Sequence, residues 1–426
     1  MAYTIKGNPK QGLAGATFGF LIGFAAVSLF GPTAGFLKEM LGLTAFQVSW
    51  LVAAPALSGS LLRIPFSAWV DTTGGRKPFL VLLGISILGM MGLLGVVSQL
   101  ESIQHMSGLY PLLLGLGVCV GCGIATFSVG IGQVSYWFPQ TGQGQALGTY
   151  AGLGNLAPGA ISFVLPYALT ELGLPGTYLA WLACLVGGTG MYFLSGRNAW
   201  YFQLREQGAS PEEARKIAEE THGQELFPSG NAVQGLKVSA GIWKTWALVS
   251  VYFTTFGGFI ALTSWLPTYW TEFHGVAATT AGSLTALYSI GASLIRVPGG
   301  AISDRIGGET TLMVSLIMMG AGAVVMTLSG EFYLSVAGEV LLAAGMGVAN
   351  AAVFKLVPQE IPQAVGGAAG WVGGLGAFGG FAIPPMMAVF VARSGEAGYS
   401  QGFGVFVVLA ILSLGVAIYI RHAHTR

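Results

Sequence analysis

Two arginines lie next to long apolar stretches of this sequence, where a charged side chain is costly and indicates a specific role. Arg63 and Arg296 each follow a long uncharged apolar stretch, and each precedes an aspartate, Asp71 or Asp304, by eight residues. Eight residues are about two helical turns, or roughly 12 Å of depth in a helix. An arginine at that depth in a membrane costs ~3 kcal/mol and nearly always faces a bundle interior or an aqueous cavity. The two positions therefore predict one shared polar site, although side chains that reach back to the membrane surface remain the alternative.

The ligand of such a site is expected to be a small anion. No acidic residue in the apolar stretches is placed to neutralise the arginines, because Glu339 is expected near the outer end of its helix and the five histidines in loops or in the tail. A guanidinium group is planar and offers forked donors that match planar oxyanions.

The same segments continue into a second, repeated motif. "DTTGGRKP" and "DRIGGETT" each combine an acid with a Gly-Gly pair, which permits a tight reversal. These segments resemble the signature that major facilitator transporters carry between their second and third helices. The resemblance implies that Asp71, Arg76, Asp304 and Arg305 act in conformational gating, by pairing in one state and separating in another.

The elements that carry these residues are predicted to be membrane-spanning helices. The chain has 426 residues, of which 53% are hydrophobic and 8% charged, against roughly 25% charged in soluble domains. A helix needs ~20 apolar residues to cross a bilayer. Uncharged runs of about this length or more cover 11–37, 40–62, 78–100, 172–196, 245–271, 275–295, 310–330, 361–392 and 397–420. Region 106–170 holds two further spans and region 333–357 one, so we expect an all-α membrane protein with twelve spans.

The distribution of basic residues predicts the orientation, since Lys and Arg concentrate on the cytoplasmic side. The opposite loops hold only Lys38 and Arg393. Thirteen basic residues share the other side: Lys6, Lys10, Arg76, Lys77, Arg197, Arg205, Arg215, Lys216, Lys237, Lys244, Arg305, Arg421 and Arg426. We therefore expect a multi-pass protein of the cytoplasmic membrane with both termini in the cytoplasm.

Internal similarity predicts two related halves. The arginine segments repeat after 233 residues, and "GTYAGLGNLAPGAISFVLP" resembles "GGAAGWVGGLGAFGGFAIPP" further on. We expect a six-helix half over 1–195, a cytoplasmic linker over 196–242 and a second six-helix half over 243–426. "SPEEA" within the linker has the N-cap serine and first-turn proline of a short helix. Many secondary transporters bind their substrate between such halves.

The glycine-rich segments also resemble a known family. "GLGNLAPG" and "GWVGGLGAFGGF" are similar to the paired signatures of the nitrate/nitrite porter family, a branch of the major facilitators, and "RIPFSAWVDTTGGRK" and "RVPGGAISDRIGG" are similar to its arginine segments. From the residues alone, such glycines favour close helix packing, with backbone near a compact substrate as a second use.

This resemblance implies a substrate site for nitrate or nitrite. Arg63 and Arg296 would clamp the oxygens and Asn155 would form hydrogen bonds to them. In "FSVG" and "YFTTFGGF", Phe127 and Phe256 would sandwich the flat anion. The remaining residues of the implied site are Tyr252, which would donate its hydroxyl, and the glycines Gly154, Gly373 and Gly374, the last standing where the first half has Asn155.

Lys355, in "ANAAVFKLVPQE", is the candidate for a proton-coupling residue. It lies about one turn inside a predicted span, before Pro358. If it points inward, its ammonium group loses its proton more readily and a proton can travel with the anion. The alternative is an anchor at the membrane surface.

These observations favour a secondary transporter of nitrate, nitrite or both, working by alternating access, with proton-coupled nitrate uptake preferred and nitrate/nitrite exchange as the alternative. A carrier of small organic anions and a membrane sensor remain further hypotheses. No nucleophile–base pair or metal-ligand cluster indicates an enzyme, and the three cysteines are expected to be packing residues. We expect no cofactor and no nucleic-acid partner, but the lipid bilayer, the two anions and protons as partners of a monomer.

Overall fold

The computed structural model describes residues 3–99, 107–228, 232–361 and 364–424, and these residues form helices without a β-strand. The helices of the first part are α1 (Pro9–Phe24), α2 (Ala34–Leu41), α3 (Ala45–Leu61), α4 (Arg63–Thr73), α5 (Arg76–Val97), α6 (Tyr110–Gly121), α7 (Thr126–Ser135), α8 (Gln140–Gly154) and α9 (Ala157–Ser195). The short helices that follow are α10 (Trp200–Glu206), α11 (Pro211–His222) and α12 (Ala232–Ala240). The last part comprises α13 (Trp243–Tyr252), α14 (Gly258–His274), α15 (Ala278–Ile306), α16 (Gly308–Leu328), α17 (Phe332–Glu360), α18 (Val365–Ala377), α19 (Gly379–Ser394), α20 (Ala397–Gln401) and α21 (Gly404–His424).

Within the described residues, ten helical stretches are long and apolar enough to cross a membrane. One of them, Ala146–Ser195, has 50 residues and bends at Gly173, whose φ is 66°, so it has the length of two spans. Helix α15, with 29 residues, adds a further helix of membrane length. These helices agree with twelve spans, and the expected all-α membrane fold is confirmed.

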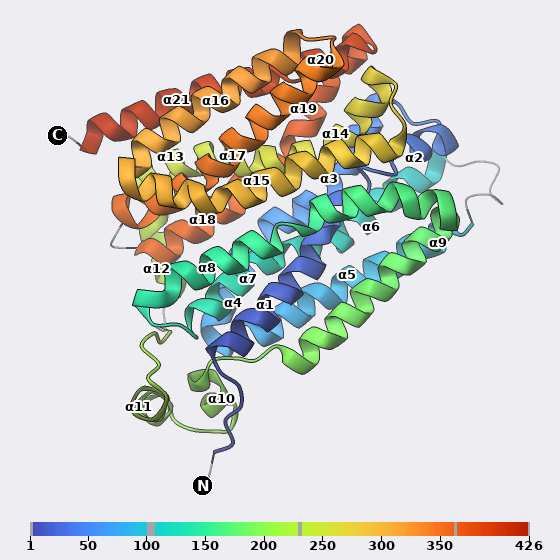
Figure 1. Ribbon diagram of the computed structural model, residues 1–426. Coiled ribbons are helices and arrows are strands. Elements are labelled where there is room, and N and C mark those ends of the chain that lie inside the picture. Colours follow the sequence, from blue (N-terminus) through green and yellow to red (C-terminus); the bar gives the residue numbers. More distant parts are fainter. Residues whose placement is uncertain (1–2, 100–106, 229–231, 362–363, 425–426) are drawn as a thin grey trace.

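The helices α1 to α9 pack mainly with one another, as do α13 to α21, and the two groups meet along α3 with α19 and along α9 with α15. Figure 1 shows both chain termini and the helices α10 to α12 at one end of the molecule, with α2 and α20 at the other. We call these ends the terminal end and the far end.

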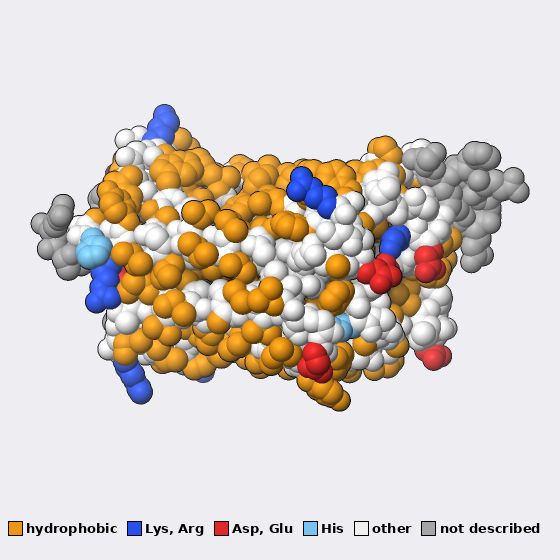
Figure 2. Space-filling model, turned by 90° about the horizontal axis from the view of Figure 1, so that it is seen from above, with side chains coloured by type: hydrophobic (Ala, Val, Ile, Leu, Met, Phe, Trp, Pro, Cys, Tyr) orange, Lys and Arg blue, Asp and Glu red, His pale blue; other side chains and the backbone are white. Residues whose placement is uncertain are grey.

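The outer surface suits a lipid environment. Figure 2 shows one face on which hydrophobic side chains dominate and charged side chains are few. Large apolar side chains stand exposed along the long helices, for example Leu194 at 70% and Leu328 at 80% exposure. In water such continuous apolar surface would aggregate, whereas in a bilayer it faces lipid tails.

At the terminal end, Ser210 caps α11 through its side chain, which confirms the short helix predicted from "SPEEA". The extended N-terminal segment is fixed to α10, because Gln203 and Gln207 exchange hydrogen bonds with the backbone of Lys6 and Thr4, respectively. The segment between α9 and α12 is therefore attached to the start of the chain in this structure.

Asn198 fixes the turn between α4 and α5. Its side chain accepts a hydrogen bond from the Arg76 N–H (2.9 Å) and donates one to the Thr73 carbonyl (3.1 Å). Gly74 has a φ of 74°, and a Cβ there would lie 2.5 Å from the Asn198 side chain. At the first glycine of "DTTGGRKP", both the positive φ and the nearby Asn198 side chain therefore disfavour a residue with a Cβ.

Replacing Asn198 by alanine is expected to lower the free energy of unfolding by about 1–3 kcal/mol, because buried backbone groups lose their partners. A thermal unfolding curve of the detergent-purified protein measures this as a lower Tm. Thr72→Ala, at an exposed position in the same turn, is the control. A Tm equal to that of the control would contradict the assigned role of Asn198.

Candidate functional site

Arg63 stands at a break between two helices. Pro65 has no N–H to donate to the Leu61 carbonyl, and α3 ends at Leu61 while α4 begins at Arg63. The interrupted helix brings the arginine to the interior of the molecule, where its side chain is fully buried (0% exposed). The expectation of an inward-facing arginine is thus met here, and a position at the membrane surface is wrong for Arg63 in this conformation.

The Arg63 guanidinium links the two halves of the molecule. Its Nε donates to the Gly59 carbonyl and its Nη1 to the Gly373 carbonyl, both at 3.0 Å. Its Nη2 is buried and has no hydrogen-bond partner. The group also lies over two aromatic rings, 4.8 Å from the Phe127 centroid and 5.2 Å from that of Phe256. One donor of a buried cation is therefore left for a ligand.

Arg296 approaches the same aromatic ring from α15. Its guanidinium carbon lies 5.9 Å from the centroid of Phe256 and 5.9 Å from that of Phe354. Its Nη1 is buried without a partner. The two sequence-predicted arginines, 233 residues apart, thus meet around Phe256.

Phe256 is positioned by an irregular turn. Residues Phe253–Gly257 form a single π-helical turn between α13 and α14, a feature often found at functional sites. The ring of Tyr252 stacks on that of Phe256 (centroids 4.9 Å apart, 9° between planes). The Tyr252 hydroxyl is buried beside Arg296 and forms no hydrogen bond of standard geometry.

Asn155 lies at a second helix break. Pro158 cannot bond the Gly154 carbonyl, and α8 ends at Gly154 while α9 begins at Ala157. The Asn155 backbone carbonyl accepts a hydrogen bond from Ser293, one turn before Arg296 on α15 (3.1 Å). The Asn155 side chain is buried and its oxygen has no partner.

The glycines of the two signatures play different steric roles. A Cβ at Gly154 would lie 1.9 Å from the Phe20 ring, and one at Gly374 would lie 2.8 Å from Ile64. A Cβ at Gly373 would meet only Phe354, at 3.9 Å. Gly154 and Gly374 therefore permit close packing, whereas Gly373 contributes its carbonyl to Arg63.

Three buried polar atoms without partners belong to residues around Phe256, namely Arg63 Nη2, Arg296 Nη1 and Tyr252 Oη. A fourth, Asn155 Oδ1, belongs to the segment that is bonded to Ser293, one turn before Arg296. Buried polar atoms normally have a hydrogen-bond partner, so several orphans around one point indicate a ligand site. Two cations and a hydroxyl donor favour an anion, and the Asn155 amide offers donors when it is rotated.

The two phenylalanine rings are close together in this conformation. The centroids of Phe127 and Phe256 are 5.9 Å apart with 31° between planes. A flat anion held between two rings needs about twice the ~3.5 Å contact distance. Sandwiching the anion would therefore require these rings to move apart by about 1 Å.

The motif acids bond within their own halves. Asp71 accepts a hydrogen bond from the Tyr136 hydroxyl (2.6 Å), and Asp304 forms an ion pair with Lys355 (2.9 Å). In the sequence, "YWFPQ" and "KLVPQ" place Tyr136 and Lys355 at equivalent positions before a Pro-Gln pair. Lys355 thus occupies the place of Tyr136 in the second half and fixes the end of α15 to α17.

The basic partners of the motifs lie apart from the arginine site. Arg76 donates to the Phe193 carbonyl (2.8 Å), and Arg305 is exposed. Lys355 also donates to the Ser303 carbonyl, so its ammonium group faces the end of α15. Within the described residues, none of Asp71, Arg76, Asp304 and Arg305 forms an ion pair between the two halves in this conformation.

Sequence reasoning did not find three features of the interior. Phe354 packs against Arg296. The only feature of the sequence that could have indicated this residue is its position directly before Lys355. Lys38 on α2 forms an ion pair with Glu272 on α14, which joins the halves at the far end. Glu339 lies near the start of α17, as the sequence indicated, but it is fully buried there because α14 covers it.

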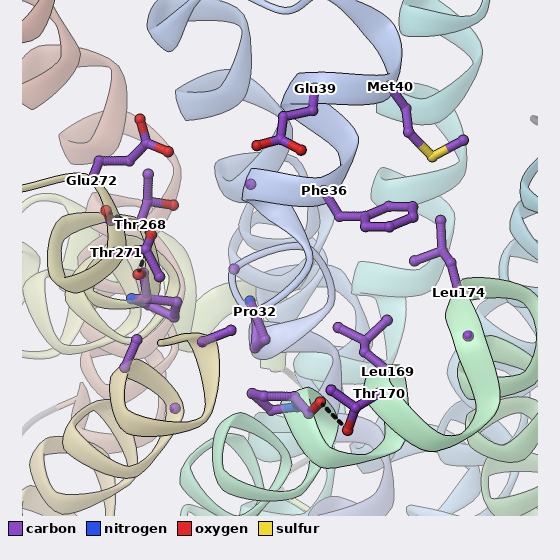
Figure 3. A pocket seen from close by; sticks show the side chains of 18 of the residues that line it. Pro32, Phe36, Glu39, Met40, Leu169, Thr170, Leu174, Thr268, Thr271 and Glu272 are labelled. Atoms are coloured by element: carbon purple, nitrogen blue, oxygen red, sulfur yellow. Dashed lines mark hydrogen bonds between the residues drawn. The ribbon is translucent and has the colours of Figure 1, made fainter. Parts of the chain in front are cut away.

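A cavity of about 640 Å³ lies near the far end, lined by α2 and α9 of the first half and by α14 and α15 of the second. Figure 3 shows Glu39 facing the side of Thr268 and Glu272, whereas the Phe36 ring points to the opposite side, toward Leu174. At the arginine site, Arg63, Tyr252 and Phe256 are each 0% exposed, whereas Arg296 is partly exposed.

Comparison with known proteins supplies the family. A model of the Major Facilitator Superfamily matches residues 16–281 and 269–426. The chain is 32% identical to a protein of Thermus thermophilus described as a probable nitrate/nitrite antiporter NarK1, over 93% of this chain and 88% of the relative. It is 27% identical to a probable nitrate transporter NarT of Staphylococcus epidermidis, over 96% of this chain and 97% of the relative.

Two solved structures share the fold. The xylose transporter XylE from E. coli superposes with a TM-score of 0.71 over 96% of this chain and 98% of its own, at 14% identity. A bacterial homologue of the human lysosomal transporter Spinster gives 0.65 at 15% identity, covering 98% of each chain. At these identities the likeness concerns the fold alone.

Proposed function

Since this chain belongs to the nitrate/nitrite porter family of the major facilitator superfamily, we propose that it carries nitrate and nitrite across the membrane by alternating access. Its relatives carry names that specify nitrate or nitrate and nitrite. The observation that supports this substrate most directly is the cluster of unpartnered polar atoms from Arg63, Arg296, Tyr252 and Asn155.

The mechanism follows from the position of the arginines. Arg63 belongs to the first half and Arg296 to the second, so an anion bound by both is held by both halves at once. When the halves rock, the anion stays between them while access changes from one end to the other. Because Arg63 bonds the Gly373 carbonyl through Nη1 and leaves Nη2 without a partner, an arriving anion can bind Nη2 while that bond is kept.

The protein is a multi-pass membrane protein, and we propose that its terminal end faces the cytoplasm. The basic residues gather in the segments of this end, as the positive-inside rule requires. In this orientation the 640 Å³ cavity lies in the outer part of the molecule. The linker 196–242 then lies in the cytoplasm between two transport halves, 1–195 and 243–426, and the protein acts as a monomer without catalysing a reaction.

Uptake of nitrate with protons is our preferred mode, and exchange of nitrate for nitrite is the second candidate. Exchange is favoured because, among the residues that the structure describes, the contacts of Arg63 and Arg296 include no acidic residue and no histidine. Symport needs a titratable group, and Lys355 is the one the sequence indicates. Its ion pair with Asp304 would have to open during the cycle.

Reconstituted liposomes with an internal pH dye test both modes. External nitrate is added to vesicles without internal anion substrate, and internal acidification is expected for symport. Acidification that is lost in Lys355→Gln would assign the proton to this lysine. Nitrate entry only after nitrite has been preloaded would show exchange. Competition by small carboxylates and phosphate esters for nitrate binding tests the organic-anion alternative, in which these compounds bind better than nitrate.

A further inference from the structure

A buried carboxyl group in the second half takes no part in the site described above. Glu339 on α17 is 0% exposed. Its Oε2 accepts a hydrogen bond from the Trp270 indole N–H of α14 (2.8 Å), and its Oε1 is buried without a partner. Among the described residues it forms no ion pair. An ionised carboxylate with one neutral donor is strongly disfavoured in such a setting, so the geometry suits a carboxylic acid that holds a proton.

Within the part of the chain that the structure describes, no cation is paired with Glu339. Tyr269 on α14 and Tyr288 on α15 are near neighbours, and the Tyr288 hydroxyl donates to Met346 Sδ (2.9 Å). On α2 the only basic residue, Lys38, is bonded to Glu272. The other titratable groups on the helices that surround this site are Glu39 on α2, His274 on α14, Arg296, Asp304 and Arg305 on α15, Glu309 on α16, Tyr333, Lys355 and Glu360 on α17, Tyr399 on α20, and Glu331 and Glu396 just before α17 and α20.

Polar groups connect this carboxyl with the far end of the molecule. Ser335 lies one turn before Glu339 on α17, and its hydroxyl is buried without a partner. Tyr269 lies near both Ser335 and Glu339. The Tyr269 hydroxyl is bonded to His274 Nε2 (3.1 Å), at the end of α14, where the imidazole is partly exposed. The order is therefore a partly exposed imidazole, a phenol, a serine hydroxyl and a buried carboxyl.

We propose that Glu339 is a proton-binding site that is loaded from the far end through His274, Tyr269 and Ser335. The step adds one proton from outside water to the carboxylate and gives a neutral carboxylic acid; no other bond changes. The proposal rests on the proposed transport function and gives symport a titratable group other than Lys355. Because only the neutral form tolerates burial, proton binding favours the conformation in which α14 covers Glu339.

Infrared difference spectroscopy tests the proton itself without any transport. The wild-type protein is expected to show the C=O stretch of a protonated carboxylic acid at neutral pH, shifted in D2O and absent in Glu339→Gln. Glutamine keeps the shape and the acceptor for Trp270, so the variant is expected to fold. Glu331→Gln, at the exposed start of the same helix, is the matched control and should keep the band. A wild-type spectrum without the band, or a band that Glu339→Gln retains, overturns the proposal.

Vesicle assays test the link to transport. Glu339→Gln is expected to lose nitrate-driven acidification and to keep nitrate/nitrite exchange, while His274→Gln slows the acidification. Acidification equal to wild type in Glu339→Gln overturns the proposal. A wild-type protein that exchanges the two anions without moving protons also overturns it, but leaves the transport function intact. If no nitrate moves in any assay, the transport function has failed, and the infrared band alone decides whether Glu339 holds a proton.

Discussion

Replacing Arg63 by lysine is expected to reduce nitrate binding and transport on the order of 100-fold, equivalent to about 3 kcal/mol. Lysine keeps the positive charge but loses the planar fork, which serves Gly59 and Gly373 at once and leaves Nη2 for the anion. A lysine ammonium at this position cannot satisfy both carbonyls and the ligand in the same geometry. Its stronger hydration also makes complete burial more costly.

The measurement is nitrate binding by isothermal titration to the detergent-purified variant, followed by uptake into liposomes. Arg393→Lys, at an exposed position of the far end, makes the same chemical change outside the site and should behave like wild type. Arg63→Lys must also keep a cooperative thermal transition for the loss to be assigned to the site. Nitrate affinity within twofold of the control would show that Arg63 does not hold the anion.

Replacing Gly154 by alanine is expected to abolish transport and to lower the Tm. The new Cβ would lie 1.9 Å from the Phe20 ring, which cannot turn aside. Phe20 is fully buried and packs on Phe127 (5.3 Å between centroids) and on Tyr150 (5.1 Å). Overpacking of this kind costs about 1–3 kcal/mol, and the displaced ring pushes Phe127, one of the two rings against which Arg63 lies.

Gly373→Ala is the matched variant in the second signature. Its Cβ would meet only Phe354 at an ordinary contact distance of 3.9 Å, and the Gly373 carbonyl stays available to Arg63. We therefore expect a Tm close to that of wild type and retained nitrate binding. Equal losses of Tm in both variants would mean that the two glycines have the same steric role, contrary to the structure.

Much of this protein could be predicted from the sequence, because a membrane limits the possible structures severely. An uncharged run must form a helix, since only a helix satisfies its own backbone groups in lipid. A charge within such a run must face the interior, which identified Arg63 and Arg296. The repeat at 233 residues then suggested that the two arginines occupy related positions in two halves. The resemblance in the glycine segments supplied Asn155 and the aromatic residues.

Tertiary structure decided which groups touch. Sequence spacing places Glu339 one and a half to two turns from the start of its helix, where an acid usually meets water, but the Trp270 indole from α14 covers it. The position of Lys355 within a predicted span suggested a titratable side chain that faces the interior. In the structure this side chain forms an ion pair with Asp304 instead. Contacts of this kind depend on how distant helices pack and rotate about their axes. The apolar pattern could not supply that information, because in lipid both the buried and the exposed faces of a helix are hydrophobic.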